Sequence, residues 1–237
     1  MWQALHTEFE SKGVTVVTIS LDSDPSLAYP WIDAASPTHP SLIDRSHVTG
    51  GLLGFTNIPM AIWVNEDGVI VRPAEAASIT PNTLAGQPLP EGLPPRITAR
   101  LEIVQQFEDT HETYLAALRD WVERGSDSPY ALAADEVIAR SQPRSDDEAR
   151  ASACFELGNA VRERSSLEAA SAWWREAHRL DPGNWTYRRQ AWSLATTKPG
   201  EPSDLIQEPT DLFEGNWLDD VVAGGGAAGY TIKFSGV

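Results

Sequence analysis

Thiol chemistry is limited to one position in this sequence. Cys154 is the only cysteine among 237 residues, so the chain cannot form an internal disulfide or a cysteine-based metal cluster. Thiol–disulfide exchange needs a thiolate, usually at a helix N-terminus that lowers the pKa of the thiol. Cys154 falls instead within a helical pattern, on the face that we expect to be packed. The sequence therefore predicts no catalytic cysteine.

The sequence contains no clear motif for binding a metal ion or a phosphate group. Glu108, His111 and Glu112 share one face of a predicted helix and could hold a metal ion, but acidic helices often carry such triplets, and we expect a solvated face. The glycine-rich segment 50–54 lacks the Lys-Ser/Thr pair of a phosphate loop. We predict no metal and no cofactor. The histidines are scattered along the chain: His6, His39, His47, His111 and His178.

A β-hairpin is the clearest structural pattern in the first third of the chain. Two short apolar runs, Met60–Val64 and Val69–Val71, flank the turn sequence Asn65-Glu66-Asp67-Gly68. Asp-Gly is favoured where a tight hairpin needs positive φ angles. Pro59 stands at the start of the first run, where it removes one ladder donor and where its bond to Ile58 can be cis.

Helices and strands alternate in the segments before this hairpin. Segment 14–21 is an almost continuous β-branched run, which suits a parallel strand buried on both faces. Pro30 is expected to shorten or kink the helix that follows. The predicted elements, in order, are helix 2–12, strand 14–21, a helix from the capping residues 22–26 to about Ala35, short strand 42–44 and helix 47–55.

This order, continued by Ile-Pro, strand, Asp-Gly turn and strand, resembles the thioredoxin-like superfamily, most closely the TlpA/ResA-like and AhpC/TSA-type redoxins. The resemblance covers about the first third of the chain. It implies that Ile58 and Pro59 line a substrate groove, with the proline cis and next to a redox-active Cys-x-x-Cys pair. That pair should precede the first helix, and the sequence does not contain it. The Pro-x-x-x-Thr-x-x-Cys loop of an AhpC/TSA-type peroxidase is also missing.

The resemblance further implies a strand that the sequence lacks. In the family, the strand before Cys-x-x-Cys is central and lies between those that correspond to 14–21 and 60–64. Each buried backbone group left unpaired would cost roughly 1–3 kcal/mol, so something must replace this strand. Three interpretations stay open. The sequence is a fragment that begins inside the active-site helix, for instance because a selenocysteine codon was misread as a stop; the sheet closes up; or another segment, such as Tyr230–Phe234, supplies a strand. We favour the fragment.

The rest of the chain is predicted to be mainly helical. We expect an α/β fold with an incomplete thioredoxin-like domain over 1–73, its first strand missing, followed by a Pro- and Gly-rich linker over 74–95. An α-helical domain follows over 96–195. Within it, Ser128-Pro129 is expected to open one helix and a capping box from Ser145 to Glu148 to open another.

Segment 151–184 resembles one tetratricopeptide repeat (TPR), a pair of antiparallel helices. Gly158 and Ala170 would let the two helices approach closely, and Cys154 stands where the family prefers tryptophan. About three repeats are normally needed for independent stability, so we expect this pair to be stabilised by contacts with the neighbouring parts of the chain. The matching positions are Cys154, Leu157, Gly158, Val161, Ala170, Trp174, Ala177 and Pro182.

The final region, 196–237, is predicted to be a mostly irregular, acidic and Gly-rich tail. Phe213, Trp217 and Leu218 fall at helical spacing between acidic residues. They could dock on a groove of the helical domain, although an aromatic patch that packs locally is the interpretation we favour.

Charge restricts the expected partners. The formal charge of −16 argues against nucleic acid and anionic membrane surfaces, because both favour Lys and Arg. No apolar run reaches the length of a membrane span, and the first residues lack the layout of a signal peptide. The chain as written is expected to be cytoplasmic, or exported if a signal segment precedes it.

Together, the resemblances imply a TlpA/ResA-like thiol–disulfide oxidoreductase that acts on a protein disulfide and is inactive as given. The alternative is a non-catalytic adaptor whose TPR-like helices bind a protein partner.

Overall fold

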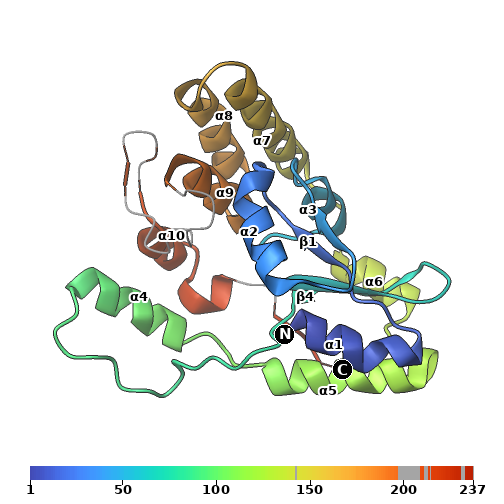
Figure 1. The fold of residues 1–237 in the computed structure, drawn as a ribbon. Helices are drawn as coiled ribbons and strands as arrows, with labels where there is room; N and C mark the ends of the chain where they lie inside the picture. Colours follow the sequence, from blue (N-terminus) through green and yellow to red (C-terminus); the bar gives the residue numbers. More distant parts are fainter. Residues whose placement is uncertain (142, 197–208, 211–212, 214, 231–232, 237) are drawn as a thin grey trace.

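A computed structural model describes residues 1–141, 143–196, 209–210, 213, 215–230 and 233–236. These residues form a mixed α/β structure with two small sheets surrounded by helices (Figure 1). Among the helices of these residues, none has the length and hydrophobicity of a membrane span.

The first sheet pairs β1 (Thr18–Ser20) with β2 (Ser41–Ile43) in parallel, with Ile19 opposite Leu42. Helix α2 (Pro25–Ala35) connects them, and the side chain of its N-cap Asp24 accepts from the backbone N–H of Ser26. The prediction of a fully buried strand over 14–21 is wrong in length and in burial. Strand β1 covers only residues 18–20, because β2 offers only three residues for pairing. None of the three residues of β1 is fully buried.

The second sheet is the predicted hairpin, formed by the antiparallel strands β3 (Met60–Val64) and β4 (Ile70–Ala76). The turn differs from the expected one, because only Gly68 has a positive φ, of 76°. The backbone N–H of Gly68 donates to the carbonyl of Asn65 at 3.0 Å, which makes a three-residue loop closed by glycine. Since β4 extends to Ala76, the first residues of the predicted linker 74–95 belong to a strand.

The two sheets remain separate in the described part of the chain. The hypothesis that the sheet closes up is therefore wrong. The alternative strand at Tyr230–Phe234 lies partly outside the described residues. Of its described members, Tyr230 stacks on Phe107 with ring centroids 5.2 Å apart, and Phe234 contacts the ring of Tyr114 at 5.2 Å.

Two helices cover one face of the hairpin. They are α1 (Trp2–Phe9), followed by the short 3₁₀ helix η1 (Glu10–Lys12), and α5 (His111–Arg124), which lie side by side (Figure 1). Trp63 is central, because its indole N–H donates to the Tyr114 hydroxyl at 3.3 Å and its ring stacks on Trp121 at 5.2 Å. The buried members of this core are Leu5, Phe9, Trp63, Ala77, Tyr114, Ala117, Leu118 and Phe234.

The segment between α5 and the TPR-like region differs from the expectation. The helix predicted to open at Ser128-Pro129 begins instead at α6 (Ala134–Ser141), after the 3₁₀ helix η2 (Gly125–Asp127). A long-range bond accounts for the difference, because the backbone N–H of Leu132 donates to the carbonyl of Val71 at 2.9 Å. Helix α4 (Pro95–Gln105) precedes α5.

A buried arginine ties the C-terminal residues to β4. Arg72, 1% exposed, pairs with Glu75 at 2.8 Å and donates to the carbonyl of Gly236 at 2.7 Å. Its guanidinium also lies 4.3 Å from the ring centroid of Phe234. A buried charge is tolerated only when it is paired and hydrogen-bonded, and Arg72 meets both conditions.

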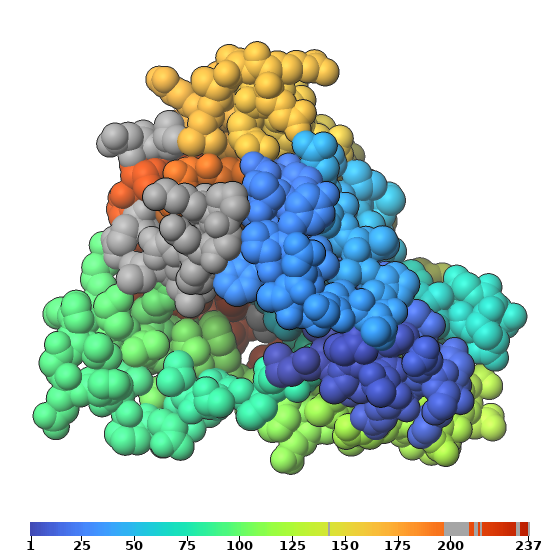
Figure 2. All heavy atoms as spheres, in the orientation of Figure 1, coloured from blue at the N-terminus to red at the C-terminus, as the bar shows by residue number. Residues whose placement is uncertain are grey.

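The TPR-like segment forms two long antiparallel helices and a third helix that follows them. They are α7 (Asp146–Arg164), α8 (Leu167–Leu180) and α9 (Trp185–Thr196). The predicted capping box from Ser145 to Glu148 is present. On the face shown in Figure 2, α2 fills the space between the α7–α8 pair and α1.

Short helices complete the fold: α3 (Val48–Leu53) before the hairpin, and α10 (Trp217–Ala223) with the 3₁₀ helix η3 (Gly226–Gly229) near the end. The tail aromatics separate. Phe213 packs in the α7–α8–α9 core, 5.1 Å from the ring of Trp192, whereas Trp217 packs beside Trp185 and Tyr230. Docking on the helical domain predicted over 96–195 is therefore observed for all three: Phe213 enters the α7–α8–α9 core, and Trp217 and Leu218 pack in a second cluster with Trp185 and Phe107.

Gly158 tests the packing of α7 on α8. A Cβ at this position would lie 2.5 Å from the ring of Trp174, which is 2% exposed. Gly158→Ala should therefore lower the free energy of unfolding by about 1–3 kcal/mol in urea titrations, despite the better helix propensity of alanine. The matched change Gly183→Ala meets only one atom, at 4.0 Å, and should stay within about 0.5 kcal/mol of the original chain. Equal stability of the two variants would contradict the close contact.

Candidate functional site

A large cavity lies between the two sheets. It has a volume of about 1700 Å³ and is bounded by the chain segments 14–22, which contain β1, and 57–67, which contain β3. We call this cavity the strand slot. Its edges are the β1 edge that faces away from β2 and the β3 edge that faces away from β4.

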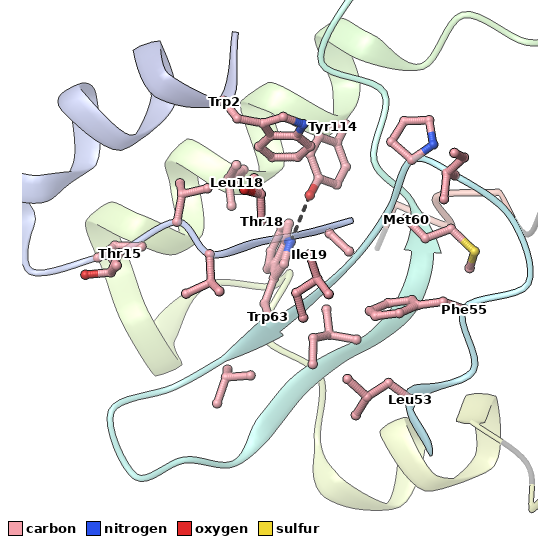
Figure 3. Close-up of a pocket in the computed structure, with 18 of the residues that line it drawn as sticks. Trp2, Thr15, Thr18, Ile19, Leu53, Phe55, Met60, Trp63, Tyr114 and Leu118 are labelled. Carbon is pink, nitrogen blue, oxygen red and sulfur yellow. Dashed lines mark hydrogen bonds between the residues drawn. The ribbon is translucent and has the colours of Figure 1, made fainter. Parts of the chain in front are cut away.

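The walls of the slot are mainly apolar and come from two layers of helices. Trp2, Tyr114 and Leu118 approach from one side, and Leu53 and Phe55 from the other (Figure 3). The first group belongs to α1 and α5. The second belongs to α3 and the turn after it, on the side of the strands where α2 and α9 also lie (Figure 1).

Backbone groups of β1 point into the slot. Thr18 donates its N–H to the carbonyl of Pro40 at 3.0 Å, and the carbonyl of Ser20 accepts from Asp44 at 2.8 Å, both on the β2 side. Backbone groups of successive strand residues alternate between the two edges. The N–H and carbonyl of Ile19 are therefore directed toward β3.

Strands β1 and β3 run in opposite directions across the slot. The C-terminal end of β1 is held by α9, because the Ser23 N–H donates to the side chain of Gln190 at 3.0 Å. The segment just before β3 meets the same helix, because the Trp185 N–H donates to the carbonyl of Thr56 at 2.7 Å. Five residues of helix span only about 7.5 Å, so the end of β1 and the start of β3 lie close together.

Ile58 and Pro59 lie at this same end of the slot, and both line it. Their peptide bond is cis, and Ile58 is 57% exposed. Asn57, which sequence reasoning missed, fixes this turn: its side-chain amide donates to the carbonyl of Tyr230 at 2.8 Å, and its side-chain oxygen accepts from the N–H of Ile58 at 2.9 Å. No local pattern identifies Asn57, because its partner is 173 residues away in sequence.

The only thiol is not part of the slot. Cys154 lies on α7 and packs against the core between α7, α8 and α9, as predicted. Glu108, His111 and Glu112, for which we expected a solvated face and not a metal site, do not form a metal-binding group. His111 pairs with Asp109 at 2.6 Å, and the described residues contain no group of three or more His, Cys, Asp or Glu side chains that could hold a metal ion.

His47 was one of the scattered histidines, and the structure places it at the slot. It is 1% exposed and its ring lies 4.6 Å from Phe155 and 6.1 Å from Tyr187. Burial lowers the pKa of His47 to about 4, although the negative charge of Asp44 acts in the opposite direction. Nearby, burial raises the pKa of Asp22, against a hydrogen bond from Ser20.

Stability should therefore depend on pH through His47. His47 binds a proton near pH 6.5 in the unfolded chain and only near pH 4 in the folded chain. The contribution of neutral His47 to the free energy of unfolding is therefore fully present above pH 6.5 and is lost as the pH falls from 6.5 to 4. From pH 7 to pH 5 the loss from this group is up to about 2 kcal/mol. His178, whose pKa is also lowered to about 4 by burial, acts in the same direction.

Urea unfolding of the original chain and of His47→Gln between pH 5 and 7 measures this contribution. The variant should lose stability less steeply as the pH falls, whatever its stability at pH 7. If the free energy of unfolding falls equally with pH in the two proteins, His47 is not buried as a neutral group.

Comparison of the chain with protein-family models, with curated proteins and with solved structures gave no match.

Proposed function

We propose that residues 1–237 belong to a thioredoxin-like protein of the TlpA/ResA-like thiol–disulfide oxidoreductase type, whose activity needs an added strand and a cysteine pair from outside these residues. The observation that carries the proposal is the strand slot. It is lined by β1 and β3, which pair with β2 and β4 in two separate sheets, and Ile58 and Pro59 lie at one of its ends. This is the position at which the family resemblance implies a central strand, followed by the redox pair.

The chemistry would take place at that end of the slot. A thiolate attacks a protein disulfide and forms a mixed disulfide, which a second thiol of the pair then resolves, releasing the reduced substrate. The exposed side chain of Ile58 and the ring of Pro59 would contact the substrate chain beside the attacking sulfur. Residues 1–237 supply the groove and no attacking sulfur, since Cys154 does not line the slot.

A non-catalytic adaptor is the second candidate. Its support is the exposure of two large apolar side chains on the TPR-like pair, because Leu157 and Trp173 are each 40% exposed. The gene sequence ahead of the codon for Met1 discriminates between the candidates. An in-frame apolar strand followed by Trp-Cys-x-x-Cys, or by selenocysteine in place of one cysteine, favours the enzyme, and a genuine start codon without such a frame favours the adaptor.

This chain alone should not reduce protein disulfides. In an insulin-reduction assay, its rate should equal that of the variant Cys154→Ser, because the packed thiol of Cys154 cannot reach a substrate at Ile58 and Pro59. Turnover well above that of the variant would overturn our assignment of the thiol chemistry.

An N-terminal extension tests the proposal directly. An apolar strand followed by Trp-Cys-x-x-Cys, joined ahead of Met1, should give insulin reduction. The same extension with both cysteines changed to serine should give none. An extended protein that folds, protects the amide of Ile19 from hydrogen exchange and still lacks activity would count against the oxidoreductase and leave the adaptor.

A further inference from the structure

We infer that the strand slot binds an extended apolar segment of a partner protein, with basic residues at the end that meets Glu66 and Asp67, as an inserted strand that pairs with β1 and β3 at once. This inference rests on the proposed function, because it names the partner chemistry of the same slot. It adds that the strand can be delivered as a separate polypeptide.

Backbone pairing is the first reason. A polypeptide in the slot meets two strand edges, and because β1 and β3 are antiparallel, it must pair in parallel with one and antiparallel with the other. On the β1 side, Ile19 presents its N–H and carbonyl. On the β3 side, β4 already uses the opposite edge, where the N–H of Ala77 donates to the carbonyl of Pro59 at 3.1 Å. Strand addition to an exposed sheet edge is a general mode of peptide recognition.

Side-chain chemistry is the second reason. A strand in the slot would direct alternate side chains to its two faces. Both faces carry large apolar side chains, Leu118 and Trp121 on one and Leu53 and Phe55 on the other, and polar side chains of α9 border only the end near Ser23. The inserted segment must therefore be apolar at consecutive positions, as strands buried on both faces are.

The size of the slot favours a polypeptide over a small molecule. Ligand pockets commonly measure about 300–1,000 Å³, and the strand slot has about 1700 Å³. The adjacent strand β3 has five residues, which sets the length of ladder that an inserted strand can share with it.

Charge defines one end of the partner segment. The slot has an acidic group at each end, Asp22 where β1 ends and Glu66 with Asp67 where β3 ends. Two cations also line the slot. The ammonium of Lys12 pairs with Glu123 at 2.6 Å, and Arg189 lies on α9, the helix that is bonded to Ser23 next to Asp22. With a formal chain charge of −16, the end at Glu66 and Asp67 is therefore the one that favours lysine or arginine beside the apolar run.

A synthetic peptide tests the inference on the chain as it exists. The probe has about five consecutive valine and isoleucine residues, with lysines at one end. It should bind, as measured by fluorescence anisotropy, and should protect the amide of Ile19 from hydrogen exchange. No binding, or binding without protection at Ile19, would overturn the inference.

Two blocked peptides separate strand pairing from simple apolar contact. Methylation of alternate backbone nitrogens removes the donors on one edge of the peptide and leaves the other edge intact. Because the slot pairs with both edges, each blocked peptide should bind at least about tenfold more weakly. Unchanged affinity of either one would contradict insertion between two strands.

Two protein variants locate the peptide. Ile62 lines the slot on β3 and Leu52, 69% exposed on α3, does not. Ile62→Lys should weaken binding at least about tenfold, whereas Leu52→Lys should leave it unchanged. An equal loss in both would place the peptide elsewhere, and dimerisation of the chain that excludes the peptide would show that a second copy occupies the slot. Because the peptide contains no sulfur, the result of the binding test does not depend on the result of the insulin-reduction test.

Discussion

The backbone hydrogen-bonding groups of β1 and β3 that face one another across the strand slot are the constraint around which the first third of the chain is arranged. A strand edge left unpaired in an apolar cavity would cost about 1–3 kcal/mol for each buried group. The chain limits this cost by keeping β1 short and by leaving Val17 and Val64, at the borders of the slot, 50% and 43% exposed. Only part of the apolar run 14–21 therefore forms a strand.

The separation of the two edges is maintained from outside the slot. At one end, α9 bonds both to Ser23 after β1 and to Thr56 before β3. On the far edge of the hairpin, Arg72 ties β4 to the C-terminal residues. Side chains are packed on both sides of the strands: Trp63 of β3 contacts Tyr114 of α5, and His47, just before α3, contacts Phe155 of α7. The slot is thus open although the side chains around it are well packed.

The sequence predicted those features that depend on neighbouring residues. The hairpin, the capping box at Ser145 and the close approach at Gly158 follow from local turn, cap and repeat patterns. Features that depend on distant partners were missed, such as the length of β1, which β2 sets, and the late start of α6, which the bond between Leu132 and Val71 imposes. In the candidate site, Ile58 and Pro59 could be named from the family resemblance, whereas Gln190 and its partner Ser23 are 167 residues apart and carry no common pattern.

The contribution of α9 also changes how the division into domains should be understood. The linker predicted over 74–95 separates the strands from the helical region in sequence, yet α9 follows the TPR-like pair and lines the slot through Thr186 and Gln190. Since the α7–α8 core includes Tyr187 and Trp192 of the same helix, the packing of the helical pair fixes α9, and α9 fixes one end of the slot. The helical region is therefore part of the site that the strands form, because the width of the slot at Ile58 and Pro59 depends on where the pair places α9.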